Sequence, residues 1–215
     1  MSAATAAEKM DRQYRFQRHI YDATRTHYLF WRRRLIGDLR PPANASIVEI
    51  ACGTGWNIVR SARTYPDARY FGFDISSEML RTAEAAVDRN GLSQKVKLAH
   101  GDATNFDLYA MFGLRTADRI FISYALSMIP DWPSAVDCAA RSLAPDGALH
   151  IVDFGRMDTM PAPARFAFLK FLNHYNVTPR RDLEAVVQAA AKRHGLSLTF
   201  EEMRSGYTAY AVLKR

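Results

Sequence analysis

Cysteine is scarce in this chain: only Cys52 and Cys138 occur among 215 residues. Two cysteines are too few for a disulfide framework, so a reducing compartment is expected. Neither the cysteines nor the six histidines show the spacing of metal ligands, and no metal site is predicted. No run approaches the ~18 apolar residues of a transmembrane helix, and residues 1–13 lack the apolar core of a signal peptide. We therefore expect a cytoplasmic protein, with contact to a membrane surface still possible.

The positive charge of the chain is concentrated near its N-terminus. The formal net charge is +7, and residues 9–40 contribute +6 of it, from nine basic and three acidic residues. Glu8 removes one charge, so residues 41–215 carry only +2. With 48% hydrophobic and 24% charged residues, the chain has the composition of a soluble domain with one core. The basic balance therefore describes an N-terminal arm and not the domain that follows it.

Residues 1–40 form the predicted arm, and residues 41–215 form the predicted domain. In the arm, side chains recur at three- and four-residue steps along one helical face, namely Met10, Tyr14, Tyr21, Thr24, Tyr28, Trp31 and Leu35. Arg12, Arg15, Arg33 and Arg34 project on the opposite side, and Pro41 and Pro42 end the pattern. Such a helix can lie on an anionic membrane or close over a ligand. It can equally pack on the domain with its arginines solvated.

Strand and helix patterns alternate through the rest of the chain. Strands are predicted at 46–51, 69–73, 96–99, within 117–129 and at 148–154. Helices are predicted at 56–65, 76–91, 133–143 and 181–195, and residues 196–215 are predicted to form an antiparallel hairpin. This alternation predicts an α/β fold with a Rossmann-like, doubly wound seven-stranded sheet, mostly parallel with an antiparallel C-terminal pair.

A tight glycine turn follows the first predicted strand, in the stretch VEIACGTGWN at 48–57. Gly53 and Gly55 let the backbone turn sharply and approach a ligand closely. In doubly wound folds, ligands bind at the carboxyl ends of the strands. Asp74 ends the second strand and is placed to accept the hydroxyls of a ribose, while Asp102 follows the third and can accept an adenine amino group. The three elements together predict a nucleotide site, although the turn alone could be an ordinary connection.

Two residues around this turn indicate which nucleotide is bound. A dinucleotide fingerprint has glycine or alanine where this chain has Ile58, and Glu49 would repel a diphosphate but suits a sulfonium. Residues 49–55, EIACGTG, resemble the glycine loop of class I S-adenosylmethionine-dependent methyltransferases. The resemblance runs from Ser46 to the C-terminus and implies S-adenosyl-L-methionine as the cofactor. Ala51 stands where the family usually has its first glycine, which we expect to be tolerated with Ala51 at negative φ.

The end of the fourth predicted strand bears on the methyl acceptor. Methyltransferases of nucleic-acid bases resemble one another in an Asn/Asp-Pro-Pro-Tyr/Phe motif there, whereas residues 123–126 are SYAL. Protein arginine methyltransferases carry two glutamates in the following loop, but no glutamate occurs between Glu84 and Glu184. Neither class is therefore expected, and no nucleic-acid partner is predicted.

Several stretches are similar to bacterial betaine-lipid N-methyltransferases, which trimethylate diacylglyceryl-homoserine. They are the arm, GDAT at 101–104, FISYALSMIP at 121–130, LHIVDFG at 149–155 and VTPRRDL at 177–183. Residues 30–33, FWRR, depart from the Gly-Arg-Asp-like sequence expected there. The resemblance implies methylation of a lipid head-group amine at the inner face of an anionic membrane, with phosphatidylethanolamine as the alternative acceptor. Residues 166–175 could cover acyl chains or belong to the core.

The resemblance also implies a set of site residues. The cofactor set is Tyr21, Arg33, Glu49, Ala51, Cys52, Gly53, Gly55, Asn57, Asp74, Ile75, Met79, Gly101, Asp102, Ala103, Ser123 and Tyr124. The substrate set is Tyr14, Arg18, Met128 and Tyr207. Arg18 and Arg33 are candidates to hold a carboxylate of methionine or homoserine. Cys52 is more simply explained as buried filler.

Methyl transfer from a sulfonium is a direct displacement that needs no protein nucleophile, because positioning and exclusion of water supply much of the acceleration. The candidates for aromatic faces that hold a quaternary ammonium are Tyr14, Tyr21, Tyr124 and the substrate residue Tyr207. The other catalytic candidates are His19 as proton acceptor and Asp153 to orient the amine. Each has a plainer alternative, since tyrosines pack, His19 can face solvent and Asp153 can cap a neighbouring element. A nicotinamide dehydrogenase and a non-catalytic lipid-binding module are the other classes considered.

Overall fold

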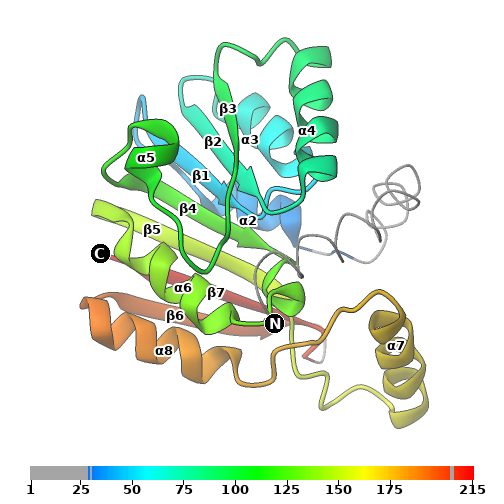
Figure 1. Ribbon diagram of the computed structural model, residues 1–215. Coiled ribbons are helices and arrows are strands. Elements are labelled where there is room, and N and C mark those ends of the chain that lie inside the picture. The colour runs from blue at the N-terminus through cyan, green and yellow to red at the C-terminus, as the bar shows by residue number, and fades with distance from the viewer. Residues whose placement is uncertain (1–28, 30, 204–205) are drawn as a thin grey trace.

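The computed structural model describes residues 29, 31–203 and 206–215. They form a seven-stranded sheet in the order β3-β2-β1-β4-β5-β7-β6 (Figure 1). The strands are β1 Ser46–Ile50, β2 Arg69–Asp74, β3 Val96–His100, β4 Ala117–Ser123, β5 Leu143–Phe154, β6 Ser197–Met203 and β7 Thr208–Lys214. Strands β1 to β5 are parallel, whereas β7 is antiparallel to both β5 and β6. The predicted sheet with its antiparallel C-terminal hairpin is confirmed.

Helices cover both faces of this sheet and enclose two hydrophobic cores. One core contains α2 Arg32–Asp38, α3 Trp56–Thr64 and α4 Ser77–Arg89, and the other contains α5 Leu108–Phe112, α6 Trp132–Arg141 and α8 Leu183–His194. A short 3-10 helix, η1 Leu126–Met128, follows β4, and α7 Ala162–His174 follows β5. In Figure 1, α7 stands beside the layers near the ends of β4 and β5, and it covers neither face of the sheet.

Local sequence explains the elements that prediction placed well. All five residues of β1 are buried, as expected for the central strand of a parallel sheet with both faces covered. The serine cap predicted for α4 is present, because Ser76 Oγ accepts a hydrogen bond from the Met79 backbone N–H at 3.3 Å. Gly91, just beyond this helix, has a φ of 66°. This left-handed conformation is common where helices end, and glycine adopts it without the steric cost of a Cβ.

Strand β5 begins five residues before its predicted start at Ala148. Its pairing with β4 shifts register, since Ala117 pairs with Leu143 and Arg119 pairs with Ala148. Asp146, between the two paired segments, is exposed and has a φ of +61°. A polar residue inside the strand hid this irregularity from the hydrophobic pattern, which began again only after Gly147.

Two helices were not predicted at all. Helix α5 has only five residues, which is too short for a periodic pattern to appear. Helix α7 is apolar on almost every side, so the contrast between faces that identifies an amphipathic helix is missing. Only Leu172 of this helix is buried.

The described end of the predicted arm packs into the domain. Leu35, Ile36 and Leu39 on and after α2 are each at most 2% exposed, and they join the core of α3 and α4. Residues 1–28 lie outside the described residues, so the helical arm and its membrane contact stay predictions. No helix in the described part of the chain has the length and apolar character needed to cross a membrane.

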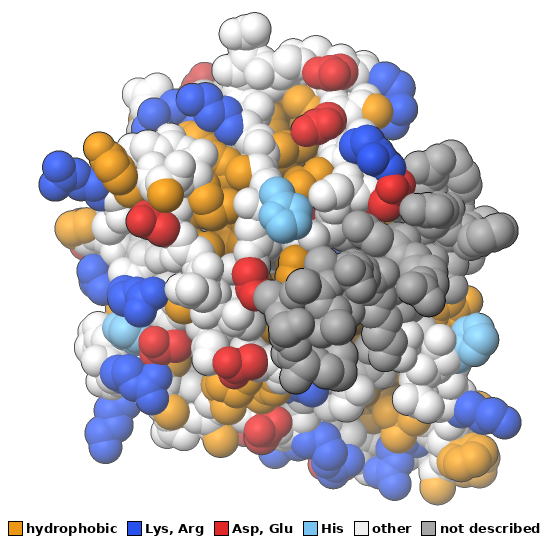
Figure 2. Space-filling model, in the orientation of Figure 1, with side chains coloured by type: hydrophobic (Ala, Val, Ile, Leu, Met, Phe, Trp, Pro, Cys, Tyr) orange, Lys and Arg blue, Asp and Glu red, His pale blue; other side chains and the backbone are white. Residues whose placement is uncertain are grey.

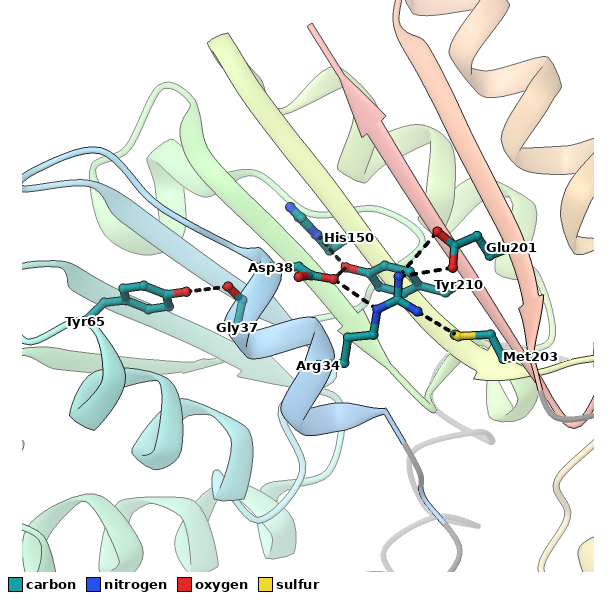
Figure 3. A network of polar contacts seen from close by, with 8 residues as sticks. All are labelled: Arg34, Gly37, Asp38, Tyr65, His150, Glu201, Met203 and Tyr210. Carbon is teal, nitrogen blue, oxygen red and sulfur yellow. Dashed lines mark hydrogen bonds and ion pairs between the residues drawn. The ribbon is translucent and has the colours of Figure 1, made fainter.

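Polar contacts attach α2 to strands β5, β6 and β7 (Figure 3). Arg34 Nη2 donates to Glu201 Oε2 at 3.1 Å, and Arg34 Nε donates to Asp38 Oδ2 at 3.3 Å. Tyr210 OH donates to Asp38 Oδ2 at 3.3 Å and lies 3.0 Å from Nδ1 of the buried His150. Burial lowers the pKa of His150 to about 4, so its ring is neutral near pH 7. The helical pattern had suggested that Arg34 projects away from the domain. In the structure Arg34 instead binds the sheet.

The carbonyl groups at the end of α2 are also satisfied. Tyr65 OH donates to the Gly37 carbonyl oxygen at 2.9 Å (Figure 3). Arg119 Nε donates to the Leu39 carbonyl oxygen at 2.6 Å. The last carbonyl groups of a helix have no partner within the helix, and these two side chains supply partners at the C-terminal end of α2.

Candidate functional site

The carboxyl ends of the central strands meet where the strand order reverses. Strand β1 pairs with β2 on one side and with β4 on the other. The chain leaves β1 toward β2 on one side and leaves β4 toward β5 on the other. This divergence opens space for a ligand above the end of β1. The predicted cofactor residues on β1, β2, β4 and the loop after β3 are thus brought to one edge of the sheet.

The turn from β1 to α3 is built on left-handed backbone. Gly53 has a φ of +53° and Gly55 a φ of +76°. A Cβ at Gly55 would lie 3.1 Å from Cβ of Ala83, so the absence of a side chain lets the turn pack on α4. A Cβ at Gly53 would meet no atom within 4 Å, which means that this position faces open space. Gly53 thus lets a ligand approach the backbone, and Gly55 lets the helix approach the turn.

Ala51 departs from the sequence-based expectation. Its φ is +55°, whereas a negative φ was expected to make alanine acceptable at this position. The turn requires the left-handed region here, which is why the family usually has glycine. An alanine pays roughly 1–2 kcal/mol for that conformation, and the surrounding turn imposes it.

Glu49 is buried inside this edge, with 1% of its surface exposed. Its Oε1 accepts a hydrogen bond from Asn57 Nδ2 at 2.7 Å. Burial raises the pKa of Glu49 to about 8, and the Asn57 hydrogen bond and the nearby Arg32 oppose that rise. A buried acid of this kind favours a cationic ligand group that would stabilise its ionised form.

Three buried polar atoms at this edge have no hydrogen-bond partner among the described residues: Glu49 Oε2, Asn57 Oδ1 and Ser123 Oγ. Ser123 follows Ile122, which pairs with Ile50 of β1, and Asn57 at the start of α3 donates to Glu49 of β1. The three atoms therefore belong to β1, the end of β4 and the first turn of α3. Buried groups of this kind cost free energy unless a ligand or water pairs with them. These atoms fit the amino acid portion of S-adenosylmethionine, whose ammonium can donate to Glu49 Oε2 and to Asn57 Oδ1.

Arg32 is a site residue that sequence reasoning missed in favour of its neighbour. The predicted Arg33 is exposed, whereas Arg32 is 7% exposed and its guanidinium lies 4.2 Å from the ring centroid of Trp56. Its charge acts on both Glu49 and Tyr124. Arg32 is therefore the arginine of α2 that is placed to attract the carboxylate of a bound amino acid. Two adjacent arginines in one helix give no sequence signal for which one points inward.

Asp74 is held by the backbone of two turns. Its Oδ2 accepts the Gly53 N–H at 2.8 Å, and its Oδ1 accepts the Ser76 N–H at 2.9 Å. Burial raises the pKa of Asp74, and these hydrogen bonds oppose the rise. Each carboxylate oxygen keeps a further lone pair, so Asp74 can still accept ribose hydroxyls. This geometry links the acid at the end of β2 to the glycine turn after β1.

The predicted adenine side of the site follows β2 and β3. Asp102 Oδ1 accepts hydrogen bonds from the N–H and the hydroxyl of Thr104, both at 2.8 Å. A Cβ at Gly101 would lie 2.7 Å from Cε of Met111, so the flexible end of the Met111 side chain would have to move to admit it. The remaining predicted members are close by in the chain: Ile75 and Ala103 adjoin the two acids, and Met79 is buried in α4.

Cys52 is buried, and its pKa is raised well above the usual value by burial and by the nearby acids. Its thiol is therefore held neutral, which agrees with the simpler explanation as filler. The described residues contain no group of three or more histidine, cysteine or acidic side chains that could hold a metal ion.

The end of β4 carries the central aromatic residue of the site. Tyr124 is 2% exposed, has a φ of +53°, and its OH lies 3.2 Å from Thr208 Oγ1. Asp153 is fully buried, and its oxygens accept the backbone N–H groups of Ser127 at 3.2 Å and Phe154 at 2.8 Å. These contacts favour the capping role for Asp153. Burial raises its pKa to about 6.

Aromatic rings continue outward from Tyr124. Its ring centroid lies 4.9 Å from that of Phe154, which lies 5.9 Å from Tyr207. Phe168 of α7 is 5.1 Å from Tyr207, and Phe171 is 6.0 Å from Phe168. We call these five rings the aromatic row. The structure thus brings the predicted substrate residue Tyr207 beside Tyr124, whereas Met128 belongs to η1 and packs at the edge of the same core.

Four predicted site residues, Tyr14, Arg18, His19 and Tyr21, lie outside the described residues. Their roles as cation cage, carboxylate ligand and proton acceptor therefore remain predictions.

Part of this chain is similar to known methyltransferases. A family model described as a methyltransferase domain matches residues 47–147. A demethylmenaquinone methyltransferase of Lactiplantibacillus plantarum is 26% identical over 129 residues, which are 60% of this chain and 53% of that protein. One from Staphylococcus aureus is 30% identical over 118 residues, covering 54% of this chain and 46% of that protein. The chain thus spans about half the length of these curated relatives.

Solved structures agree with the fold. A putative methyltransferase from Haloferax volcanii, in complex with a methyltransferase activator, has a TM-score of 0.72 at 14% identity and covers 95% of this chain and 96% of that one. Phosphoethanolamine N-methyltransferase 2 of Haemonchus contortus, in complex with S-adenosyl-L-methionine, has a TM-score of 0.65 at 20% identity, with 80% and 38% covered. The region that matches the methyltransferase domain model contains the glycine turn, Asp74 and Asp102, and the similar solved structures share the fold of this chain.

Proposed function

We propose that this protein transfers methyl groups from S-adenosylmethionine to the amine of a lipid head group at the inner face of a membrane. The proposed acceptor is diacylglyceryl-homoserine, which becomes the trimethyl betaine lipid. The alternative acceptor is phosphatidylethanolamine. Stretches of the chain similar to betaine-lipid N-methyltransferases, described above, support the first choice.

The observation that carries the proposal is the aromatic row. It begins at Tyr124, next to the cofactor residues of β1, and ends at Phe171, which is 40% exposed on α7. An acceptor with an apolar tail and a small charged head suits such a row, because the rings can cover apolar surface along its length. At the inner end, ring faces can hold the positive charge that the methylated nitrogen acquires.

The chain's own side chains would act by binding and orientation. S-adenosylmethionine, when bound, supplies the electrophilic methyl group. Glu49 and Arg32 are placed to hold the charged amino acid end of the cofactor, and Asp74 to hold its ribose. The Tyr124 hydroxyl is engaged with Thr208 at 3.2 Å, and we expect the ring of this buried residue to contact the acceptor nitrogen once the cofactor and acceptor are bound. Exclusion of water by the rings would favour the neutral amine and the displacement.

A second candidate acceptor comes from the curated relatives. Both relatives described above are named demethylmenaquinone methyltransferases, and their similarity to this chain exceeds 25% identity. An apolar, aromatic acceptor region would also suit methylation of such a compound. The two candidates differ in the atom methylated, which is nitrogen for the lipid amine.

The deciding experiment is methyl transfer with each acceptor in turn. The purified protein would be incubated with isotope-labelled S-adenosylmethionine and detergent-dispersed diacylglyceryl-homoserine, phosphatidylethanolamine or demethylmenaquinone, and the products weighed by mass spectrometry. We expect mono-, di- and trimethylated homoserine lipid. Label in demethylmenaquinone alone would overturn the lipid-amine proposal, and binding of S-adenosylmethionine without transfer to any acceptor would favour a non-catalytic lipid-binding module.

A further inference from the structure

Exposed apolar side chains are unevenly distributed over the described surface. Four large hydrophobic residues are exposed there, and three of them lie on α7: Phe166 at 72%, Leu169 at 37% and Phe171 at 40%. The fourth, Tyr109 at 63%, lies on α5. Figure 2 shows orange side chains gathered at the lower right, over α7, with blue ones beside them. A concentration of apolar surface in one helix marks a contact surface more strongly than scattered single residues do.

Helix α7 is unusual because it is apolar yet exposed. A helix that is hydrophobic on nearly all sides is ordinarily buried in a core or in a membrane, but only Leu172 among its residues is buried. Leu172 and Phe168 attach it to the domain through the core that also contains Phe154 and Met157. The rest of the helix is therefore held out from the body of the protein by a small anchor.

The charge of α7 is of one sign. The helix contains Arg165, Lys170 and His174 and no acidic residue. Arg165 lies 3.8 Å from Asp158, whereas Lys170 is exposed. Apolar side chains interleaved with basic ones match the interface of an anionic bilayer, where the rings enter the boundary between head groups and acyl chains. Long basic side chains can then reach back to the lipid phosphates.

From these observations we infer that α7 docks the protein on an anionic lipid bilayer, with Phe166 and Leu169 inserted at the boundary between head groups and acyl chains. The inference rests on the proposed function in one respect, that the acceptor is a lipid drawn from this bilayer. The aromatic row supplies the continuity between the two, because Phe168 and Phe171 on α7 connect through Tyr207 and Phe154 to Tyr124. A head group could then reach the cofactor while its tails stay near the membrane.

The test is co-sedimentation of the full chain with vesicles that contain no acceptor amine. Vesicles of phosphatidylcholine alone would be compared with phosphatidylcholine mixed with phosphatidylglycerol, using the wild type, the double variant Phe166→Asp with Leu169→Asp, and the control Tyr109→Asp. We expect wild type and control to bind the anionic vesicles equally. The double variant should bind about tenfold less or weaker still, since it loses two apolar insertions and adds negative charge.

Wild-type binding by the double variant would overturn the inference, because the anionic surface would then be contacted elsewhere, for example by the arm. Dimers of the wild type that dissociate in the double variant, measured by light scattering without lipid, would overturn it in favour of a second copy covering α7. Thermal unfolding checks that both variants fold. We expect them to fold, because the substituted side chains are exposed.

A second measurement follows the helix directly. Phe166→Cys can be labelled with an environment-sensitive dye, because both native cysteines are buried. The emission should shift to the blue on addition of anionic vesicles, and an unchanged spectrum would contradict insertion. Methyl transfer to detergent-dispersed acceptor should be unaffected in the double variant. If the double variant lost vesicle binding but the wild type methylated no lipid acceptor, the proposed function would be wrong and the inference that α7 docks on the bilayer would still hold.

Discussion

The two halves of the site are built on different principles. The cofactor half, on β1 to β3 and α2 to α4, consists of buried polar side chains fixed by short backbone turns, such as Asp74 held by Gly53 and Ser76. The acceptor half, on β4, β5, β7 and α7, consists of the aromatic row. Polar groups in the first half would fix one ligand in one orientation. Ring faces in the second half tolerate ligands of different shapes, because contact with them has little directional demand.

This difference agrees with how the chain compares with other proteins. The matched family model ends at residue 147 and so includes β1 to β4 and the start of β5, but not α7. Binding of one cofactor needs a defined arrangement of polar atoms, whereas different acceptors can be served by altering the segment between β5 and β7.

The largest expected effect is the pH dependence caused by Glu49. The folded protein keeps a proton on Glu49 between pH 4.5 and about 8, where the unfolded chain has released it. Stability of the ligand-free protein contributed by this group is therefore present at low pH and lost as pH rises through that window, at up to about 1.4 kcal/mol per pH unit. Glu49→Gln should remove this slope in denaturant unfolding measured against pH. The exposed control Glu84→Gln should keep it, and parallel wild-type and Glu49→Gln curves would contradict the burial of this acid.

The next effect is on cofactor affinity. Asp74→Ala removes a charged acceptor for the ribose and should weaken S-adenosylmethionine binding by about 2–3 kcal/mol, measured by calorimetry. Asp137→Ala is the matched control, because Asp137 lies on α6 and pairs with Arg193 and His194 away from the site. Equal affinity of Asp74→Ala and wild type would count against the ribose assignment, and circular dichroism would verify that the variant folds.

A smaller effect is expected in the acceptor half. Tyr124→Phe removes the hydrogen bond to the fully buried Thr208 and should lower the free energy of unfolding by about 1 kcal/mol. Cofactor affinity should be unchanged, and methyl transfer should persist because the ring remains. A loss of about 100-fold or more in transfer rate would instead indicate that the hydroxyl acts in proton transfer. Thr208→Val removes the same bond from the other side, so the two stability losses should not add.

The smallest effect has the opposite sign. Ala51→Gly relieves the positive φ of 55° and should raise the free energy of unfolding by about 0.5–1 kcal/mol, since the gain exceeds the added flexibility of the unfolded chain. The exposed helical control Ala85→Gly should lose about 1 kcal/mol. Destabilisation by Ala51→Gly in denaturant titration would mean that the alanine methyl makes packing contacts worth more than the strain.

Much of the fold was predictable because its signals are local. The buried run of β1, the Ser76 cap and the spacing from the glycine turn to Asp74 are all carried by neighbouring residues. The start of β5 and the whole of α7 were missed for physical reasons: a polar irregularity interrupts the strand pattern, and the helix lacks a polar face. The negative φ expected at Ala51 was wrong because the turn as a whole, and not the residue, sets that angle.

The sequence alone determined the doubly wound α/β fold, the glycine turn and the acids at the strand ends. Periodicity and turn chemistry depend on residues close together in the chain. Only the tertiary structure decided that Arg32 and not Arg33 faces Glu49, that Asp153 caps backbone N–H groups, and that Tyr124 joins Phe168 through Phe154 and Tyr207. These relations connect residues far apart in the chain, and they exist only once the strands and α7 have packed against one another.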